Sequence, residues 1–134
     1  MHPVFEGRTW SLEIPPPWRA TQSEGIIQIS QPEGVGALHI SFARKRGGPV
    51  SKEEILEQIG ATAPVGTNVE TSVLGEFSGQ SAEYVDWHTD HFWKRWFVSN
   101  RSDLLFITYT CQRGDEDLEI PGVLDLLATL RTRA

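Results

Sequence analysis

The clearest pattern of apolar runs and polar breaks lies between Ser81 and Cys111. Three runs rich in aromatic and β-branched residues are separated by polar breaks at His88–His91 and Ser99–Asp103. Runs of this composition favour β-strands, and short polar breaks between them are typical of turns. The pattern therefore predicts a three-stranded antiparallel meander at the centre of the fold.

The register of this meander depends on where its two turns lie. A two-residue turn at Thr89-Asp90 places His88 opposite His91, and a loop over the second break places Trp96 opposite Phe106. One face then carries Val85, Trp87, Phe92, Trp96, Val98, Leu104 and Phe106, and the other carries Ala82, Tyr84, Trp93, Phe97, Leu105, Ile107 and Tyr109. Both faces are apolar, so we expect the sheet to be covered on both sides.

Weaker strand patterns occur on the N-terminal side of the meander. They cover Thr9–Ile14, Gly25–Ser30, Ala37–Ala43 and Thr67–Leu74. Three prolines at 15–17 follow the first of them, and proline cannot donate a ladder hydrogen bond. We therefore expect a rigid extended connector there, anchored on the core by Trp18.

Two helices are expected. Ser51 is a good N-cap and Glu54 completes a capping box, which predicts a helix over Lys52–Ile59 with Gly60 as its stop, or an extension into residues 61–63. A second helix is expected near Ile120–Arg131, with acidic residues before it and a favourable proline in its first turn. Its apolar positions recur at helical spacing: Ile120, Val123, Leu124, Leu127 and Leu130.

The order of these elements predicts an α+β fold, in which a mostly antiparallel sheet has helices covering both faces. A chain of 134 residues with 39% hydrophobic and 22% charged residues fits one globular domain, 1–134. A formal net charge of −6 argues against nucleic-acid binding, and no apolar run approaches the length that spans a bilayer. One cysteine excludes an intramolecular disulfide, so we expect a cytoplasmic protein that does not act at a membrane.

The layout, together with Trp10 and the Ile14-Pro15-Pro16-Pro17-Trp18 segment, resembles the Mog1/PsbP-like superfamily, including the DcrB-like bacterial proteins. The resemblance implies an α/β/α sandwich over nearly the whole chain. It also implies a non-enzymatic role in binding or assembly, as in a photosystem-associated protein, a nuclear-transport factor and bacterial accessory proteins that hold secretion effectors. It supplies no catalytic residues, and it leaves the partner undetermined.

The search for chemistry yields few candidates. The nucleotide-binding glycine motifs, the Gly-x-Ser-x-Gly elbow and the His-Glu-x-x-His zinc motif are absent from the sequence. Cys111 ends an apolar strand, so we expect a buried thiol rather than a nucleophile. His88, His91 and Asp86 would share a face under the register above and could bind zinc, with Cys111 as another possible ligand. The alternative is a polar turn with solvated histidines.

These observations favour a non-enzymatic protein-binding or assembly module without a cofactor. Its partner is expected to be another protein, and Trp87 and Trp93 are the candidate contact residues, because exposed aromatic side chains mark interfaces. The alternative is a small-molecule or metal-binding protein with its site near the His88–His91 hairpin.

Overall fold

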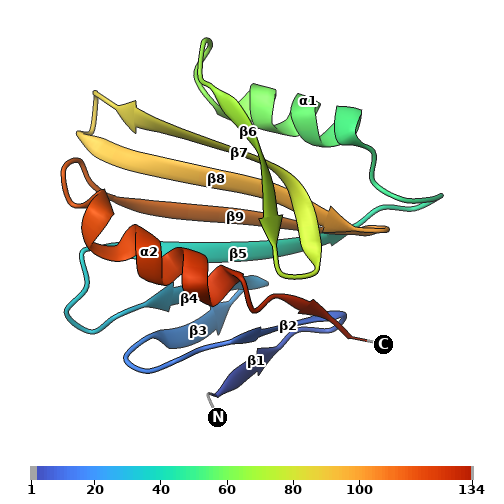
Figure 1. Cartoon of the computed structure of the whole chain (residues 1–134), viewed down its shortest axis with the longest axis horizontal. Coiled ribbons are helices and arrows are strands. Elements are labelled where there is room, and N and C mark those ends of the chain that lie inside the picture. The colour runs from blue at the N-terminus through green and yellow to red at the C-terminus, as the bar shows by residue number, and fades with distance from the viewer. Residues whose placement is uncertain (1–2, 134) are drawn as a thin grey trace.

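The structure is a computed structural model that describes residues 3–133. A seven-stranded antiparallel sheet forms its centre, with the strand order β3-β4-β5-β9-β8-β7-β6 (Figure 1). Its strands are β3 (Arg19–Ser23), β4 (Ile26–Ser30), β5 (Gly36–Arg44), β6 (Val69–Leu74), β7 (Phe77–Asp86), β8 (His91–Asn100) and β9 (Asp103–Gln112). A second sheet, in the order β1-β2-β10, is formed by β1 (Val4–Glu6), β2 (Trp10–Glu13) and β10 (Arg131–Thr132).

Two helices, α1 (Lys52–Thr62) and α2 (Glu116–Leu127), cover opposite faces of the main sheet. Ile55 and Ile59 of α1 form a small core with Phe97, whereas α2 shares the large core with Trp96. Consecutive strand residues point to opposite faces, so Trp96 and Phe97 mark the two sides. We call these sides the α2 face and the α1 face. The expected antiparallel sheet with helices on both faces is thus confirmed.

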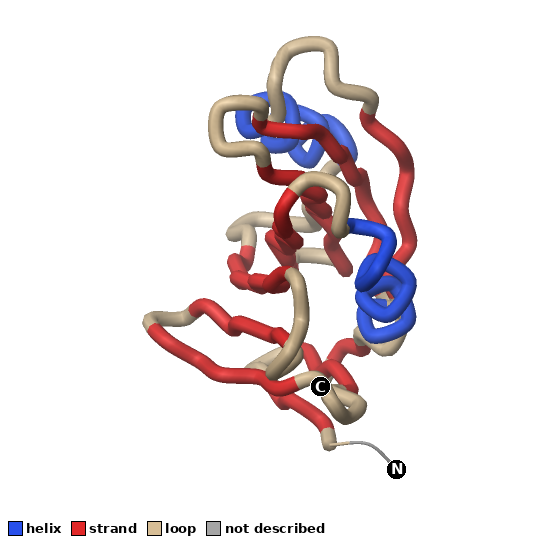
Figure 2. Tube along the Cα trace, turned by 90° about the vertical axis from the view of Figure 1, so that its left-hand side faces the viewer, coloured by secondary structure: helices blue, strands red, loops and turns tan. Residues whose placement is uncertain are grey.

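The small sheet lies at the end of the molecule away from α1. Figures 1 and 2 show both termini beside it, and α1 at the opposite end. Trp10 and Leu12 of β2 are buried in the large core together with α2, so this sheet extends the cover that α2 provides. No helix within residues 3–133 is both long and apolar enough to cross a membrane.

The central meander is confirmed as β7, β8 and β9, but both registers differ from the prediction. Asp86 pairs with His91, so the first turn spans residues 87–90, and Trp87 and His88 do not pair within the ladder. The shift is two residues, which leaves the faces unchanged.

The second register error exchanges the faces of β9. Asn100 pairs with Asp103, and Trp96 therefore lies opposite Ile107 rather than Phe106. Polarity suggested a loop over residues 99–103, but the chain turns within residues 101–102, where Arg101 has a φ of 56°. That left-handed conformation allows a two-residue hairpin turn. Leu105, Ile107 and Tyr109 consequently lie on the α2 face, and Leu104 and Phe106 lie on the α1 face.

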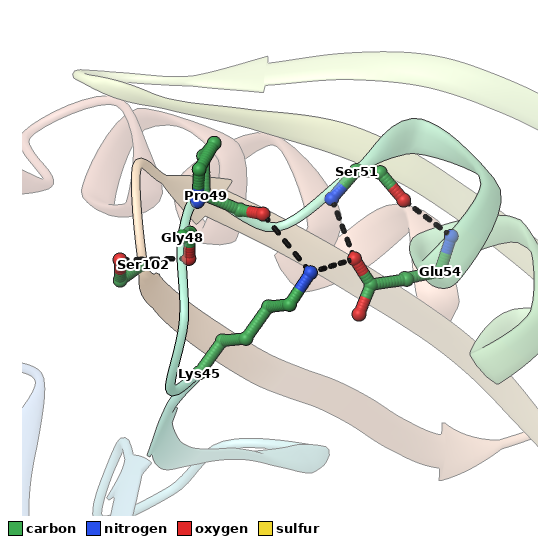
Figure 3. A network of polar contacts seen from close by, with 6 residues as sticks. All are labelled: Lys45, Gly48, Pro49, Ser51, Glu54 and Ser102. Carbon is green, nitrogen blue, oxygen red and sulfur yellow. Dashed lines mark hydrogen bonds and ion pairs between the residues drawn. The ribbon is translucent and has the colours of Figure 1, made fainter.

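The predicted cap of α1 is confirmed. The Ser51 hydroxyl accepts a hydrogen bond from the Glu54 N–H at 3.2 Å, and Glu54 Oε1 accepts from the Ser51 N–H at 3.1 Å (Figure 3). Lys45 also donates to Glu54 Oε1, and its ammonium reaches the Pro49 carbonyl at 3.2 Å. The Ser102 hydroxyl donates to the Gly48 carbonyl at 2.9 Å, which holds the same loop on the β8–β9 turn.

Of the two expected ends of α1, the stop at Gly60 is wrong and the extension beyond it is confirmed. The helix continues to Thr62, and Ala63 adopts an extended conformation with ψ of 149°. Pro64 explains this end, because the proline ring disfavours helical conformation in the residue before it.

The bounds of α2 also differ from the prediction. The acidic residues form its first turn rather than preceding it, and Pro121 lies inside the helix. The helix ends at Leu127, and Arg131 pairs with Ser11 of β2 instead of closing the helix. Pairing with a distant strand overrides the local helical pattern here.

The triple-proline segment forms a turn rather than an extended connector. The Trp18 N–H donates to the Pro15 carbonyl at 3.0 Å, and the peptide bond between Pro16 and Pro17 is cis. Trp18 is buried in the large core, as expected. The short strands β1, β3 and β10 carry too little pattern to have been predicted.

Replacing Ser51 with alanine should lower the free energy of unfolding by about 1 kcal/mol, because the part-buried N–H of Glu54 loses its acceptor. Ser51→Asp retains an acceptor at the same place and should keep most of the stability. Urea denaturation of the three proteins measures both effects. Equal midpoints for the wild type and Ser51→Ala would show that the side-chain cap does not contribute.

Glu54 should make stability depend on pH in the acid range. The hydrogen bond from Lys45, followed by that from the Ser51 N–H, lowers the pKa of Glu54 below its ordinary value of 4.5. A lowered pKa means that the stabilisation is present above 4.5 and is lost as the pH falls through the folded-state pKa. Wild type should therefore be more stable than Glu54→Gln at pH 7, and the difference should shrink below about pH 4.5.

The same comparison in a Lys45→Gln background provides the control. The advantage of Glu54 over glutamine at pH 7 should then be smaller, because the main cause of the pKa shift has been removed. Urea midpoints measured between pH 3 and pH 7 give all four curves. A difference that grows toward low pH would contradict this account.

Candidate functional site

The β7–β8 turn contains the candidate metal ligands, but the structure does not bring them together as expected. Asp86 and His91 are paired across the strands, whereas His88 lies in the turn, where its N–H donates to Asp86 Oδ1 at 2.9 Å. Cys111 is buried on the α2 face, and His91 lies on the α1 face. The proposed pairing of His88 with His91, and the use of Cys111 as a further ligand, are therefore wrong.

His91 is itself held by the turn. Its Nδ1 lies 2.8 Å from the Thr89 carbonyl, so Nδ1 carries the proton and Nε2 is the nitrogen left for a ligand. Within residues 3–133, no three His, Cys, Asp or Glu side chains gather in a group that could hold a metal ion. Metal binding at this turn stays a prediction, with Asp86 and His91 as the pair that the fold places together.

The most exposed aromatic residue of the turn is Trp87. Its side chain is 73% exposed, and the Arg113 guanidinium lies 5.0 Å from the centre of its ring. Arg113 is fixed in turn by Asp90, because its Nε lies 2.6 Å from Asp90 Oδ1 and its N–H donates to the Asp90 carbonyl. A cation and the face of an aromatic ring attract each other. The Arg113 guanidinium therefore restrains the Trp87 indole, which stays open to solvent.

Trp93 lies on the α1 face and is half-buried. The guanidinium of Arg95 lies 4.9 Å from the centre of its ring and 6.0 Å from that of Tyr84. Arg95 Nε also donates to the Tyr84 hydroxyl at 2.8 Å. The three side chains form a fixed cluster in which Trp93 offers less free surface than Trp87 does.

A buried polar pair joins α2 to the centre of the sheet. The Tyr109 hydroxyl donates to Glu119 Oε1 at 2.8 Å, and the Glu119 side chain is almost completely buried. Burial, together with this hydrogen bond, raises the pKa of Tyr109. A raised pKa favours the protonated phenol, which donates this hydrogen bond and so links β9 to α2.

Cys111 lies on the same face as Tyr109 and is 3% exposed. Burial raises the pKa of its thiol, and a nucleophilic cysteine needs the reverse, a lowered pKa and an accessible position. The expectation of a buried thiol is confirmed.

Sequence reasoning missed the two arginines, Arg95 and Arg113, that stack on the tryptophans. Alternation alone places Arg95 on the same strand face as Trp93, which was an available signal. No comparable signal exists for Arg113. It follows β9, whereas Trp87 lies in the turn between β7 and β8, so the contact depends on how these strands are arranged.

Native Cys111 should react slowly with iodoacetamide. Because the thiol is buried and protonated at neutral pH, we expect labelling at least about 100-fold slower than in 6 M guanidinium chloride at the same pH. Mass spectrometry after timed quenching measures both rates. Comparable rates in the folded and unfolded protein would contradict the burial of this side chain.

No family model and no curated protein matches this sequence. Solved structures do match. A crystal structure from Bacteroides thetaiotaomicron has a TM-score of 0.66 at 16% identity and covers 93% of this chain, which spans only 45% of that protein. The solution structure of cyanobacterial PsbP (CyanoP) from Synechocystis has a TM-score of 0.63 at 12% identity, with coverage of 98% of this chain and 92% of that one.

A crystal structure of a Pseudomonas aeruginosa protein of unknown function is also similar. Its TM-score is 0.59 at 20% identity, and the match covers 100% of this chain and 99% of that one. Identities this low show the fold and no more. The chain has the Mog1/PsbP-like fold that its sequence resemblance implied.

Proposed function

We propose that this protein is a non-enzymatic binding module that docks another protein through the β7–β8 turn. The observation that carries the proposal is Trp87, a large aromatic side chain that is 73% exposed and restrained by Arg113. Tryptophan and arginine are enriched among the residues that dominate binding energy at interfaces. A pair that is already ordered loses less conformational entropy when a partner binds.

Two side chains that could be reactive, Cys111 and Glu119, are buried, which supports a binding role over a catalytic one. The thiol of Cys111 is buried with a raised pKa, and the carboxylate of Glu119 is engaged by Tyr109 inside the core. Trp93 is the less exposed of the two candidate contact residues. We also propose a cytoplasmic location, which a single reduced cysteine fits.

The Trp87→Ala variant tests this proposal. The bait proteins are the wild type, Trp87→Ala and Leu118→Ala, whose leucine on α2 is 71% exposed and therefore serves as a matched apolar control. A protein captured by the wild type is purified, and its affinity for all three baits is measured by calorimetry. Trp87→Ala should weaken binding by about 2 kcal/mol or more, and Leu118→Ala should leave it unchanged.

The melting temperature of Trp87→Ala should equal that of the wild type, since an exposed side chain contributes little to the core. Sedimentation of the bait alone shows whether the captured partner is a second copy of this chain. Equal affinity of the partner for the wild type and Trp87→Ala would overturn the role of this turn.

A further inference from the structure

Helix α1 covers only part of its face of the main sheet. Ile55 and Ile59 pack on Phe97, and within residues 3–133 α1 packs mainly on β7 and β8, which leaves β4 and β5 without a helix on this face. A groove of about 330 Å³ lies beside α1, with Gln58 and Thr62 of the helix on one side and β4, β5, β8 and β9 below. Small-molecule sites usually begin at about 300 Å³, so the groove has the size of a site for a small ligand.

A row of polar side chains crosses the floor of this groove. Arg95 lies directly opposite Thr108, Thr108 lies opposite His39, and His39 lies opposite Gln28. Direct pairing keeps all four on one face, at intervals of about 5 Å. Arg95, Thr108 and His39 line the groove, whereas Gln28 lies outside it, and each of the three lining side chains has a hydrogen-bond donor.

Arg95 is half-buried, and its charge has no acidic partner among residues 3–133. Its Nε bonds the Tyr84 hydroxyl, and in the described chain this is the one hydrogen bond of the guanidinium. Contacts with Tyr84 and with the ring of Trp93 fix the plane of the group. Arg95 thus brings to the lining of the groove a guanidinium whose two terminal nitrogens have no hydrogen-bond partner in the described chain.

An anion with two oxygens in a plane is the group that the planar fork of a guanidinium binds best. Phe97 and Phe106 form an apolar wall next to the polar row, and their rings pack edge to face at 5.1 Å. Inorganic anions would gain nothing from that wall, whereas an organic acid can use both surfaces. We propose that the groove binds a small organic carboxylate, with its acid group on Arg95 and its apolar body against Phe97 and Phe106.

Benzoate is a suitable probe, because it combines a carboxylate with a small apolar ring. Benzamide has nearly the same shape without the charge, and inorganic phosphate has the charge without the ring. Titration followed by NMR should give a benzoate dissociation constant of about 1 mM or tighter. The largest shifts should fall on the Thr108 amide and the Trp93 indole N–H, while those of the Trp87 indole stay unchanged.

Arg95→Gln should weaken benzoate binding about tenfold or more, because the charge-assisted hydrogen bonds are lost. Lys94→Gln is the matched control: it makes the same charge change one residue away, but on the opposite face of β8, and it should leave benzoate binding unchanged. Arg95→Lys keeps the charge and the stem but not the fork, so binding should fall between that of the wild type and that of Arg95→Gln. If Arg95→Gln does not fold, the Arg95→Lys variant still tests the role of the guanidinium.

Several outcomes would overturn the proposal. These are the absence of benzoate binding to the wild type, benzamide binding as tight as benzoate binding, and equal benzoate affinities for the wild type and the folded Arg95 variants. Phosphate binding as tight as benzoate binding would overturn the role of the apolar wall.

Discussion

The main sheet has an apolar centre on both faces, and the rest of the chain is arranged to remove both from water. Burial of apolar surface is the dominant favourable term in folding, so neither face can stay open over its whole width. On the α2 face the apolar centre is buried in one continuous core, to which α2 and the small sheet both contribute. On the α1 face a single helix of 11 residues provides the cover. The strand side chains on this face become polar beyond the helix.

This unequal cover explains the position of both candidate surfaces. Phe97 and Ala82 are buried under α1, while Thr108 and His39, on strands that α1 does not reach, form the floor of an open groove. The β7–β8 turn contributes to neither core, and its Trp87 is exposed. The two surfaces therefore arise from the shortage of helical cover rather than from any added domain or insertion within the described residues.

The sequence predicts the elements of this fold better than their register. Strands and capped helices follow from local patterns, and the Ser51–Glu54 capping box appears in the structure as expected. The register of β9 does not follow, because one residue with positive φ, Arg101, decides whether the turn is short or long. Polarity alone cannot distinguish these cases, since Asn100 and Asp103 pair as strand residues.

The candidate sites depend even more on pairing between distant segments. Trp87 and Trp93 could be named as aromatic candidates, but the roles of their arginine partners require knowledge of which strands are neighbours. The groove beside α1 combines Arg95 of β8 with His39 of β5, and no local pattern relates these two residues. The metal hypothesis did not gain a third ligand, because it relied on a two-residue turn. The turn has four residues, so His88 does not pair with His91.

The contact between the two ends of the described chain has a consequence for the order of folding. The Glu13 N–H donates to the Thr129 hydroxyl across 116 residues, whereas the hairpins of the meander close over a few residues. Longer loops lose more chain entropy when they close, so β2 and β10 should join after the meander has formed. Until then, the part of the α2 face that Trp10 and Leu12 cover is open to water. The nascent chain is thus most prone to aggregation before its C-terminal segment docks.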